Sequence, residues 1–347
     1  MDPLIIHGLG LTISYECNIK CEHCCVGSYN HGNMLPPTFE KCKDIIDKVA
    51  LEGHLFAIGL SGGEPLIFYD LVCEILTYSK DKYGLEGALT TNCLWAASVD
   101  IANSFLSKLY NCGLRNISLS VDQFHQKFVP IQNAINVIEA AKKIGVQVTI
   151  QTIKTNGEWD IDHTKKLLGD HAKDCKRFVG NNFTPSGNAR TLIPRSAFPQ
   201  VNKVSGGCSI FHVINVDLDG NIIFCCGPVP RNLKHLAAGN LFNSKFRDLY
   251  RKAAFNPVYN TLFLDQGPFG LMTLADEELK TDFMHRDYTS ACHACMELFN
   301  SDCVEDLISL VNEHAAVVYC NRIYIEKMRR DKYIAENGSE LLRFRMG

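Results

Sequence analysis

Short runs rich in β-forming residues alternate with helical patterns through the first 190 residues of this chain. The helical patterns space their apolar residues three and four positions apart, and each of them ends at a glycine. Repeated units of a strand followed by a helix predict an α/β fold, with a parallel sheet and helices packed outside it. About six such units would make a partial barrel or an open sheet, with its functional site at the C-terminal ends of the strands. The expected strands cover residues 9–15, 54–61, 87–92, 115–122, 146–153 and 176–183, and the expected helices cover residues 39–53, 69–84, 99–113 and 131–145.

The pattern changes at residues 184–207, which are rich in proline, glycine and serine and are typical of a linker. Residues 211–227 then predict a hairpin with an Asp-Gly pair at its turn. The sequence after the hairpin is weakly patterned, and the tail has a helical pattern of mixed charge. We therefore expect an α/β domain at residues 1–195 and a smaller C-terminal domain at residues 196–347.

The composition is that of a globular protein, with 46% hydrophobic and 21% charged residues. A formal net charge of -3 gives no electrostatic reason to expect binding to nucleic acid. No apolar run reaches the roughly 20 residues that cross a bilayer, and the start of the chain lacks the features of a signal peptide. We therefore expect a cytoplasmic protein with neither nucleic acid nor membrane as a partner. In that reducing compartment the 16 cysteines are not expected to form a disulfide framework.

Four cysteines lie close together in the stretch CNIKCEHCC, residues 17–25, which follows the first expected strand. Thiolates with the spacing of Cys17, Cys21 and Cys24 can bind a single cuboidal iron–sulfur cluster and leave one iron open to a ligand that is not protein. A zinc site would need a fourth ligand. Cys25 offers one, but adjacent side chains rarely point at the same metal. A cysteine-rich loop without any metal is the remaining alternative.

A second motif, LSGGEPL at residues 60–66, follows the next expected strand. Gly62 and Gly63 allow a backbone to approach a ligand closely, and Glu64 places a carboxylate at the C-terminal end of the strand. That combination suits an α-ammonium group. A Gly-Gly-Glu-Pro turn is weak evidence by itself, but its position one strand–helix unit after a three-cysteine loop makes it specific.

The pair of motifs C-x3-C-x2-C and G-G-E-P resembles the radical S-adenosylmethionine (radical SAM) superfamily, and the order of strands and loops agrees over residues 9–190. The resemblance implies a partial (β/α)6 barrel of the radical SAM type. It also implies that Cys17, Cys21 and Cys24 bind a [4Fe–4S] cluster whose open iron chelates the methionyl amine and carboxylate of SAM. An electron from the reduced cluster would cleave SAM to a 5′-deoxyadenosyl radical, which abstracts hydrogen from a substrate C–H bond.

The same resemblance implies several contacts to SAM at the ends of the strands. They are Gly62, Gly63 and Glu64 at the methionyl amine, His23 near the adenine, Ser120 and Asp122 near the ribose or the substrate, and the turn of Pro185 and Gly187 on the adenine side. For Ser120, a hydrogen bond that ends its strand is an equal alternative. A low-potential electron donor such as flavodoxin or ferredoxin is the expected redox partner.

A second group of cysteines lies in the C-terminal part of the chain. The order C-x11-G-x4-C, at residues 208–225, is followed after a long gap by CHAC, and this order resembles the auxiliary-cluster domains of the same superfamily, the SPASM and twitch types. The resemblance implies a second, auxiliary [4Fe–4S] cluster with four ligands: Cys208, Cys225, Cys292 and Cys295. Zinc is the alternative for any four-cysteine set. Cys25, Cys303 and Cys320 are left without a role.

Cys226 directly follows Cys225, and neighbouring side chains on a strand point to opposite faces. If Cys225 faces the auxiliary cluster, Cys226 faces the barrel mouth, where its thiol can return a hydrogen atom to a substrate radical. Removal of hydrogen from one face and return from the other is epimerisation, so Cys226 is the candidate catalytic residue. A buried structural cysteine is the alternative. The cysteine pair also resembles the radical SAM peptide epimerases, which convert L-residues of ribosomally made peptides to D-residues.

The resemblance to peptide epimerases implies a precursor peptide as the substrate. Only 16 residues precede Cys17, too few for a separate leader-recognition domain, so the peptide would contact the barrel mouth, where His125 and Phe128 are candidates. Packing is an equal alternative for Phe128. Two other reactions stay open: a peptide maturase that forms thioether or C–C cross-links, and an epimerase or dehydrogenase of sugars or aminoglycosides. A non-enzymatic iron–sulfur or zinc scaffold is disfavoured by the Gly-Gly-Glu-Pro turn.

Overall fold

Six parallel strands form the first half of the protein. The computed structural model describes residues 6–27, 38–52, 55–157, 159–208, 213–217, 219–225 and 233–321, together with 324, 327 and 328. The six strands are β1 (Gly8–Ser14), β2 (Ala57–Gly62), β3 (Glu86–Thr91), β4 (Leu114–Ser120), β5 (Gln147–Ile153) and β6 (Arg177–Asn181). Each pairs in parallel with the strand next to it in sequence. Because each overlaps its expected stretch, the predicted α/β fold with a parallel sheet is confirmed.

The predicted hairpin is also confirmed, and it extends the same sheet. β7 (Val213–Val216) pairs in parallel with the other edge of β1, and β8 (Asn221–Ile223) and β9 (Gly239–Asn240) follow in antiparallel order. The strand order is β6-β5-β4-β3-β2-β1-β7-β8-β9. Among the described strands β6 and β9 do not pair with each other, so the sheet is an open, partial barrel.

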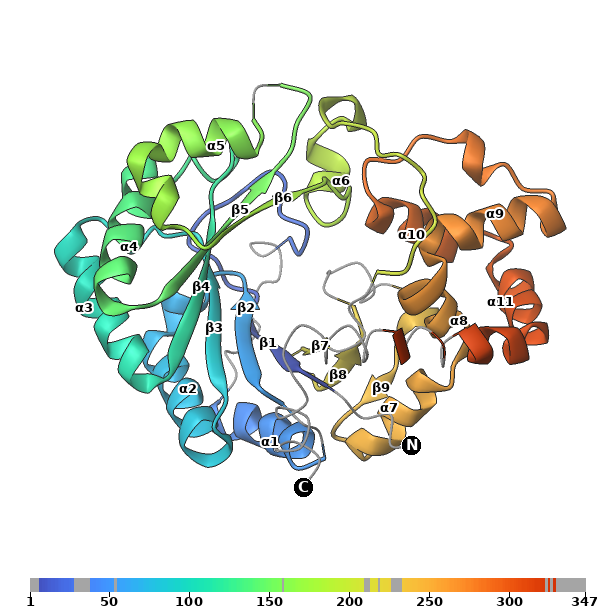
Figure 1. Ribbon diagram of the computed structural model, residues 1–347, viewed down its shortest axis with the longest axis horizontal. Helices are drawn as coiled ribbons and strands as arrows, with labels where there is room; N and C mark the ends of the chain where they lie inside the picture. Colours follow the sequence, from blue (N-terminus) through green and yellow to red (C-terminus); the bar gives the residue numbers. More distant parts are fainter. Residues whose placement is uncertain are drawn as a thin grey trace.

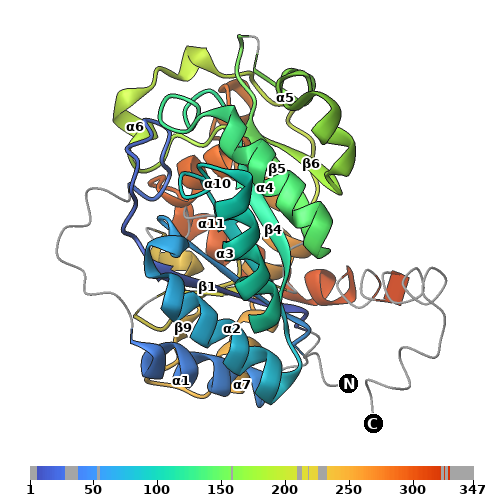
Figure 2. The same cartoon turned by 90° about the vertical axis from the view of Figure 1, so that its left-hand side faces the viewer.

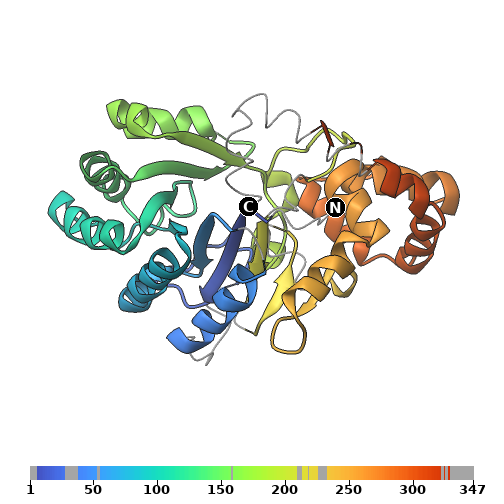
Figure 3. The same ribbon diagram turned by 60° about the horizontal axis from the view of Figure 1, so that its bottom comes forward.

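Five helices cover the outer face of the parallel strands (Figure 1, Figure 3). They are α1 (Phe39–Ala50), α2 (Tyr69–Tyr83), α3 (Val99–Cys112), α4 (Ile131–Ile144) and α5 (Ile161–Leu168), with 3-10 turns η2 (Pro65–Phe68) and η3 (Gly169–Asp174). Figure 2 shows α2, α3 and α4 side by side in front of the sheet. Ser98 caps the start of α3, and Gly84 and Gly145 end α2 and α4 with φ angles of 67° and 93°. The four helices expected from the sequence are therefore confirmed, and α5 is an addition.

The rest of the described chain is mostly helical, although its sequence pattern predicted no helices before the tail. α8 to α11 gather on the opposite side of the molecule from α2 to α4 (Figure 1). The helices are α6 (Ala189–Leu192), α7 (Phe246–Ala254), α8 (Pro257–Asn260), α9 (Gly267–Leu279), α10 (Ala291–Phe299) and α11 (Val304–Glu313), with the short turns η4 (Arg195–Ala197), η6 (Lys234–Leu236), η7 (Thr261–Asp265, a π-helix) and η8 (Phe283–His285). None of the helices in the described residues is long and apolar enough to cross a membrane.

The core lies between the sheet and its covering helices. β1 is a central strand, and its Leu9, Leu11 and Ile13 are buried. Leu106 of α3 and Val137 of α4 are fully buried as well. Apolar strands that face amphipathic helices bury a continuous apolar surface, which is the main stabilising contribution to a fold of this kind.

A polar cluster joins α1 to α2 on the outside of the sheet. Asp47 accepts hydrogen bonds from the hydroxyls of Tyr78 (2.5 Å) and Tyr83 (2.7 Å). It also accepts from the ammonium groups of Lys82 (3.0 Å) and Lys43 (3.1 Å). Burial would raise the pKa of Asp47, but these four donors outweigh it and hold the pKa well below the usual carboxyl range. The cluster is therefore held together by an ionised carboxylate.

We expect Asp47→Asn to lower the free energy of unfolding by about 2 kcal/mol at neutral pH, because hydrogen bonds to a charged acceptor are stronger than neutral ones. The folded-state pKa of Asp47 lies below the unfolded value of about 4, so this contribution is present above pH ~4 and is lost as the pH falls. Urea unfolding of both proteins at several pH values measures the difference. A difference that does not shrink in acid would contradict the assignment.

Candidate functional site

The cysteine loop follows β1 and brings its three predicted cluster ligands together. The amide of Cys24 donates to the carbonyl of Cys21 (3.2 Å), which closes a tight turn. Burial is the main cause that raises the pKa of Cys17, and the charge of Cys24 adds to it. Burial, then Asp122, then the other two thiols raise the pKa of Cys21. The three thiols thus affect one another's ionisation, and their joint role as cluster ligands stays a prediction, whereas Cys25 is exposed.

Gly62 and Gly63 let the end of β2 pack against the backbone that leads into this loop. A Cβ atom on Gly62 would lie 1.9 Å from the carbonyl oxygen of Ser14, and one on Gly63 would lie 2.0 Å from that of Glu16. Gly62 also has a φ of 142°, which residues with side chains rarely adopt. The amide of Gly63 donates to the Ser14 carbonyl at 2.8 Å. Gly62 and Gly63 therefore approach the backbone that leads into the cysteine loop and fix its position, and their contact to SAM stays a prediction.

Glu64 is buried, and its carboxylate is largely occupied by the chain itself. Oε1 accepts from the amide of Leu66 (3.1 Å) and the hydroxyl of Thr91 (2.9 Å), and Oε2 accepts from the amide of Asn92 (2.8 Å). Burial raises the pKa of Glu64 to about 7, although the three donors oppose that shift. A carboxylate has about four acceptor positions, so one is left for a ligand such as an ammonium group.

Asn92 belongs to this site, although it was not singled out from the sequence. Its side-chain amide donates to Oδ1 of Asn18 (2.8 Å) and lies 3.9 Å from Sγ of Cys17. It directly follows β3, at the edge of the sheet where the cysteine loop and Glu64 also lie. A polar residue just after a parallel strand is the sequence signal that could have identified it.

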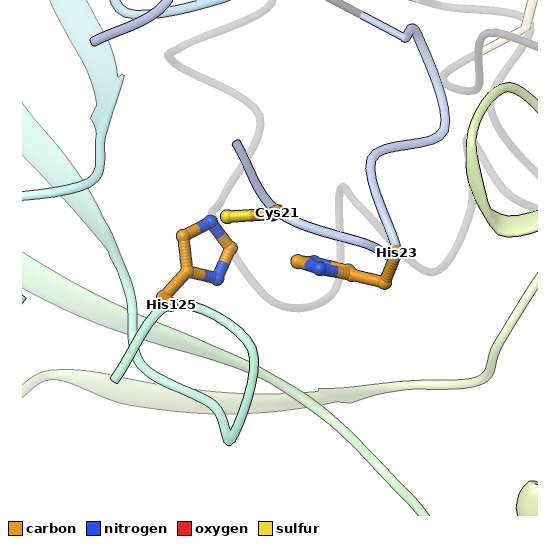
Figure 4. Close-up of side chains that lie close together, drawn as sticks. All are labelled: Cys21, His23 and His125. Atoms are coloured by element: carbon orange, nitrogen blue, oxygen red, sulfur yellow. The ribbon is translucent and has the colours of Figure 1, made fainter. Parts of the chain in front are cut away.

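Asp122 follows β4 and orients a histidine toward the cysteine loop. Its Oδ1 accepts from the amides of Phe124 (3.0 Å) and His125 (3.1 Å), and its Oδ2 lies 2.8 Å from Nδ1 of His125. Burial would raise the pKa of Asp122, but the neighbouring His125 and His23 outweigh it and lower the pKa. The ligand atoms of Cys21, His23 and His125 all lie within 4.8 Å of one another, and Figure 4 shows the His125 ring beside the Cys21 sulfur. Asp122 thus acts on this site through His125.

His23 is an enclosed imidazole beside the third cysteine. Burial lowers its pKa to about 4, so the ring is neutral at physiological pH. The ring stacks on Phe124 with 4.6 Å between centroids, and its Nε2 lies 3.8 Å from Oδ2 of Asp122. Its Nδ1 is buried and has no hydrogen-bond partner in the part of the chain that the structure describes. Such an atom costs free energy unless a ligand satisfies it, so Nδ1 is placed to bind one.

The remaining predicted contacts lie at the same edge of the sheet. Ser120 is the last residue of β4 and pairs in register with Gln151 of β5, and its contact to SAM stays a prediction. Phe128 is 41% exposed, so it is not a core residue. The turn that contains Gly187 packs on the cysteine loop, where the amide of Asn188 donates to the carbonyl of Cys24 (2.9 Å).

Three of the four predicted auxiliary ligands lie close together. Burial, with the nearby Cys292 and Cys208, raises the pKa of Cys295 on α10. Their joint role as metal ligands stays a prediction. Cys303 precedes α11 and Cys320 is exposed, and neither gains a role.

Cys225, the fourth predicted auxiliary ligand, lies toward the opposite end of β1 from the cysteine loop. β8 runs antiparallel to β7: Ile223 pairs with Asn215, which in turn pairs with Gly10 of β1. The chain that leaves β8 therefore moves toward the end of the sheet at which β1 begins. There the carbonyl of Cys225 accepts a hydrogen bond from the Asn215 side chain (2.6 Å). Cys226, the candidate hydrogen donor, lies outside the described residues.

The parallel sheet and the three-cysteine loop define a family. Residues 11–168 match the family described as the Radical SAM superfamily. This part of the chain is a radical SAM domain. The family implies a [4Fe–4S] cluster and SAM as cofactors.

Individual proteins resemble longer or shorter parts of the chain. YydG of Bacillus subtilis (strain 168), named as a peptide biosynthesis protein, is 21% identical over 299 residues, which cover 84% of this chain and 92% of YydG. GTP 3′,8-cyclase of Campylobacter curvus (strain 525.92) is 27% identical over 164 residues, which cover 44% of this chain and only 48% of the cyclase. A solved structure described as native anSMEcpe with bound AdoMet and Cp18Cys peptide is 18% identical, with a TM-score of 0.50 and coverage of 88% of this chain and 99% of the other. That likeness shows a shared fold.

The residues around the loop fit the cofactors that the family implies. Three thiols are the donor set that iron–sulfur clusters use. The backbone of β2 fixes the loop so closely that a Cβ on either glycine would overlap it. The buried Nδ1 of His23 and the remaining acceptor position of Glu64 are polar atoms that a ligand such as SAM can satisfy.

We expect Gly63→Ala to destabilise the fold by at least about 2 kcal/mol and to reduce the iron bound after anaerobic reconstitution, because the added methyl group would overlap the Glu16 carbonyl. Gly59→Ala is the matched control, since Gly59 lies in β2, which leads into Gly63, and an added Cβ there meets nothing within 4 Å. Thermal unfolding and iron analysis measure both effects. Equal losses in the two variants would count against the close approach at Gly63.

Proposed function

We propose that this enzyme acts on a ribosomally made precursor peptide and epimerises L-residues to D-residues, with Cys226 as the residue that returns the hydrogen. The radical SAM class follows from the domain, whereas the peptide and the epimerisation are the proposal. The observation that supports it most is the similarity to YydG over 84% of this chain, because YydG is named for peptide biosynthesis. The cysteine pair after the β7–β8 hairpin supports epimerisation in particular.

In the first site, Cys17, Cys21 and Cys24 would hold the cluster. The ammonium group of SAM would lie at the remaining acceptor position of Glu64, and the Nδ1 atom of His23 would bind a polar atom of the adenine. When bound, the reduced cluster and SAM supply a 5′-deoxyadenosyl radical that removes hydrogen from a substrate carbon. The chain's own contribution is to hold these groups in place and to exclude water from them.

Epimerisation requires that hydrogen leaves one face of a carbon and returns to the other. The cysteine loop lies where β1 ends, and the chain after β8 lies toward the end where β1 begins. Epimerisation by Cys226 would therefore require the segment after β8 to bring its thiol to the opposite face of the same carbon.

The return step transfers one hydrogen atom from the S–H bond of Cys226 to the substrate carbon and leaves a sulfur radical. One electron and one proton restore the thiol, so the proposal includes a low-potential donor such as flavodoxin or ferredoxin. The proposed auxiliary cluster has the ligands Cys208, Cys225, Cys292 and Cys295. One of these ligands, Cys225, directly precedes Cys226 in the sequence. In this proposal the auxiliary cluster delivers that electron.

We expect the reconstituted enzyme, with SAM, reductant and a small peptide encoded beside its gene, to add a single deuterium to that peptide in D2O. The deuterium comes from the exchangeable thiol of Cys226, so Cys226→Ala should abolish the gain. Cys175→Ala is the control, because Cys175 follows α5 in the sequence and is not a predicted ligand or hydrogen donor. Mass spectrometry of the peptide is the measurement.

The same experiment separates the alternatives. Loss of two hydrogens would show oxidation or cross-linking in place of epimerisation. Cleavage of SAM with an unchanged peptide would refute the peptide substrate and favour a sugar or aminoglycoside.

We expect the double variant Cys292→Ala, Cys295→Ala to bind about half of the wild-type iron after reconstitution, because one of two four-iron clusters would be lost. Cys175→Ala should retain the wild-type amount. Iron and sulfide analysis, with zinc measured in the same samples, is the test. Wild-type iron in the double variant, or a loss of zinc instead of iron, would refute the auxiliary cluster.

A further inference from the structure

Residues 183–188, here called the 183–188 segment, contact both of the cysteine-bearing elements. At one end the segment meets the cysteine loop. The amide of Asn188 donates to the carbonyl of Cys24 (2.9 Å), and the hydroxyl of Ser186 donates to the carbonyl of Cys25 (3.4 Å). Ser186 and Asn188 are both buried, so these hydrogen bonds are shielded from water.

Gly187 makes this contact unusually close. Its φ is 56°, and a Cβ atom there would lie 2.5 Å from the carbonyl oxygens of both Cys24 and Cys25. No side chain fits at that position, and the two backbones are in direct van der Waals contact. A shift of the segment must therefore move the cysteine loop with it.

At its other end the segment meets the start of α10, which carries Cys292 and Cys295. The hydroxyls of Thr184 and Ser290 lie 2.9 Å apart, and the hydroxyl of Thr289 donates to the carbonyl of Phe183 (2.9 Å). Ser290 is the N-cap of α10 and accepts a hydrogen bond from the amide of His293 (2.9 Å). The segment thus holds the cap of the helix on which the second group of cysteines lies.

A stack of four rings makes a second connection between the cysteine loop and the 183–188 segment. His23 of the cysteine loop stacks on Phe124 with 4.6 Å between centroids, Phe124 on Phe198 with 6.2 Å, and Phe198 on Phe183 with 3.4 Å. The three phenylalanines are buried. The stack begins beside Cys24 and ends at the residue whose carbonyl binds Thr289 of the other element.

We propose that the 183–188 segment positions the two cysteine sites relative to each other, so that the affinity for SAM at the cysteine loop depends on the contact between Thr184 and Ser290. The inference rests on the proposed function for the place of SAM beside His23 and Glu64. Thr184 is a positioning residue, because its hydroxyl reaches α10 and acts on the SAM site only through Gly187 and Asn188.

The test uses the full chain, reconstituted anaerobically, and measures the dissociation constant of SAM by calorimetry. We expect Thr184→Val, which removes the hydroxyl at constant volume, to weaken SAM binding about 5-fold, the lower end of typical coupling between sites. Thr184→Ser keeps the hydroxyl and should restore the wild-type value. Thr273→Val is the matched control, since the hydroxyl of Thr273 donates to the carbonyl of Phe269 within its own helix, α9.

The SAM-induced change in the electron paramagnetic resonance spectrum of the reduced first cluster is a second readout, which general destabilisation would not alter. Phe198→Leu breaks the ring stack and should also weaken SAM binding. It replaces Thr184→Val as the test variant if Thr184→Val does not fold. Wild-type affinity in a folded Thr184→Val, or equal weakening in Thr273→Val, overturns the positioning role. Failure of the wild-type chain to bind SAM would instead refute the proposed function.

Discussion

The buried carboxylate of Glu64 holds the ends of two neighbouring strands at a fixed spacing. It accepts hydrogen bonds from its own turn, from Thr91 at the end of β3 and from Asn92 directly after it. An enclosed carboxylate costs much free energy unless its acceptors are satisfied, so this geometry has few alternatives. The same turn presses Gly63 against the backbone of Glu16, and the cysteine loop is therefore positioned by β2 as well as by β1. The arrangement around the thiols depends on this polar contact, not on the apolar core alone.

The parallel half of the fold could be predicted because each strand and helix there carries its own periodicity. α9 could not, since it is apolar on nearly all sides: Phe269, Leu271 and Met272 are buried. A helix buried all round has no polar face to reveal the helical period, and Gly267 and Pro268 at its start resemble a turn. Its conformation is set by the elements packed around it, which no local pattern records.

The residues of the candidate site also differ in whether the sequence alone could identify them. Motif spacing identified the cysteine loop and the glycine turn, because those residues are neighbours in sequence. Asn92 is 75 residues away from Cys17, and only the pairing of β1, β2 and β3 brings them together. The short spacing between Asp122 and His125 allows a hydrogen bond but does not require one, so the orientation of the imidazole became visible only in the folded chain.

The extension of one sheet through both halves of the protein has a consequence for how the chain can be divided. β7 covers the edge of β1 that β2 leaves free, so the hairpin completes the hydrogen bonding of a central strand. A fragment that ended before the hairpin would expose the backbone donors and acceptors of β1 beside its apolar side chains. Such an edge is a template for pairing with other chains. The radical SAM half is therefore a poor candidate for expression by itself, and the two halves are best regarded as one cooperative folding unit.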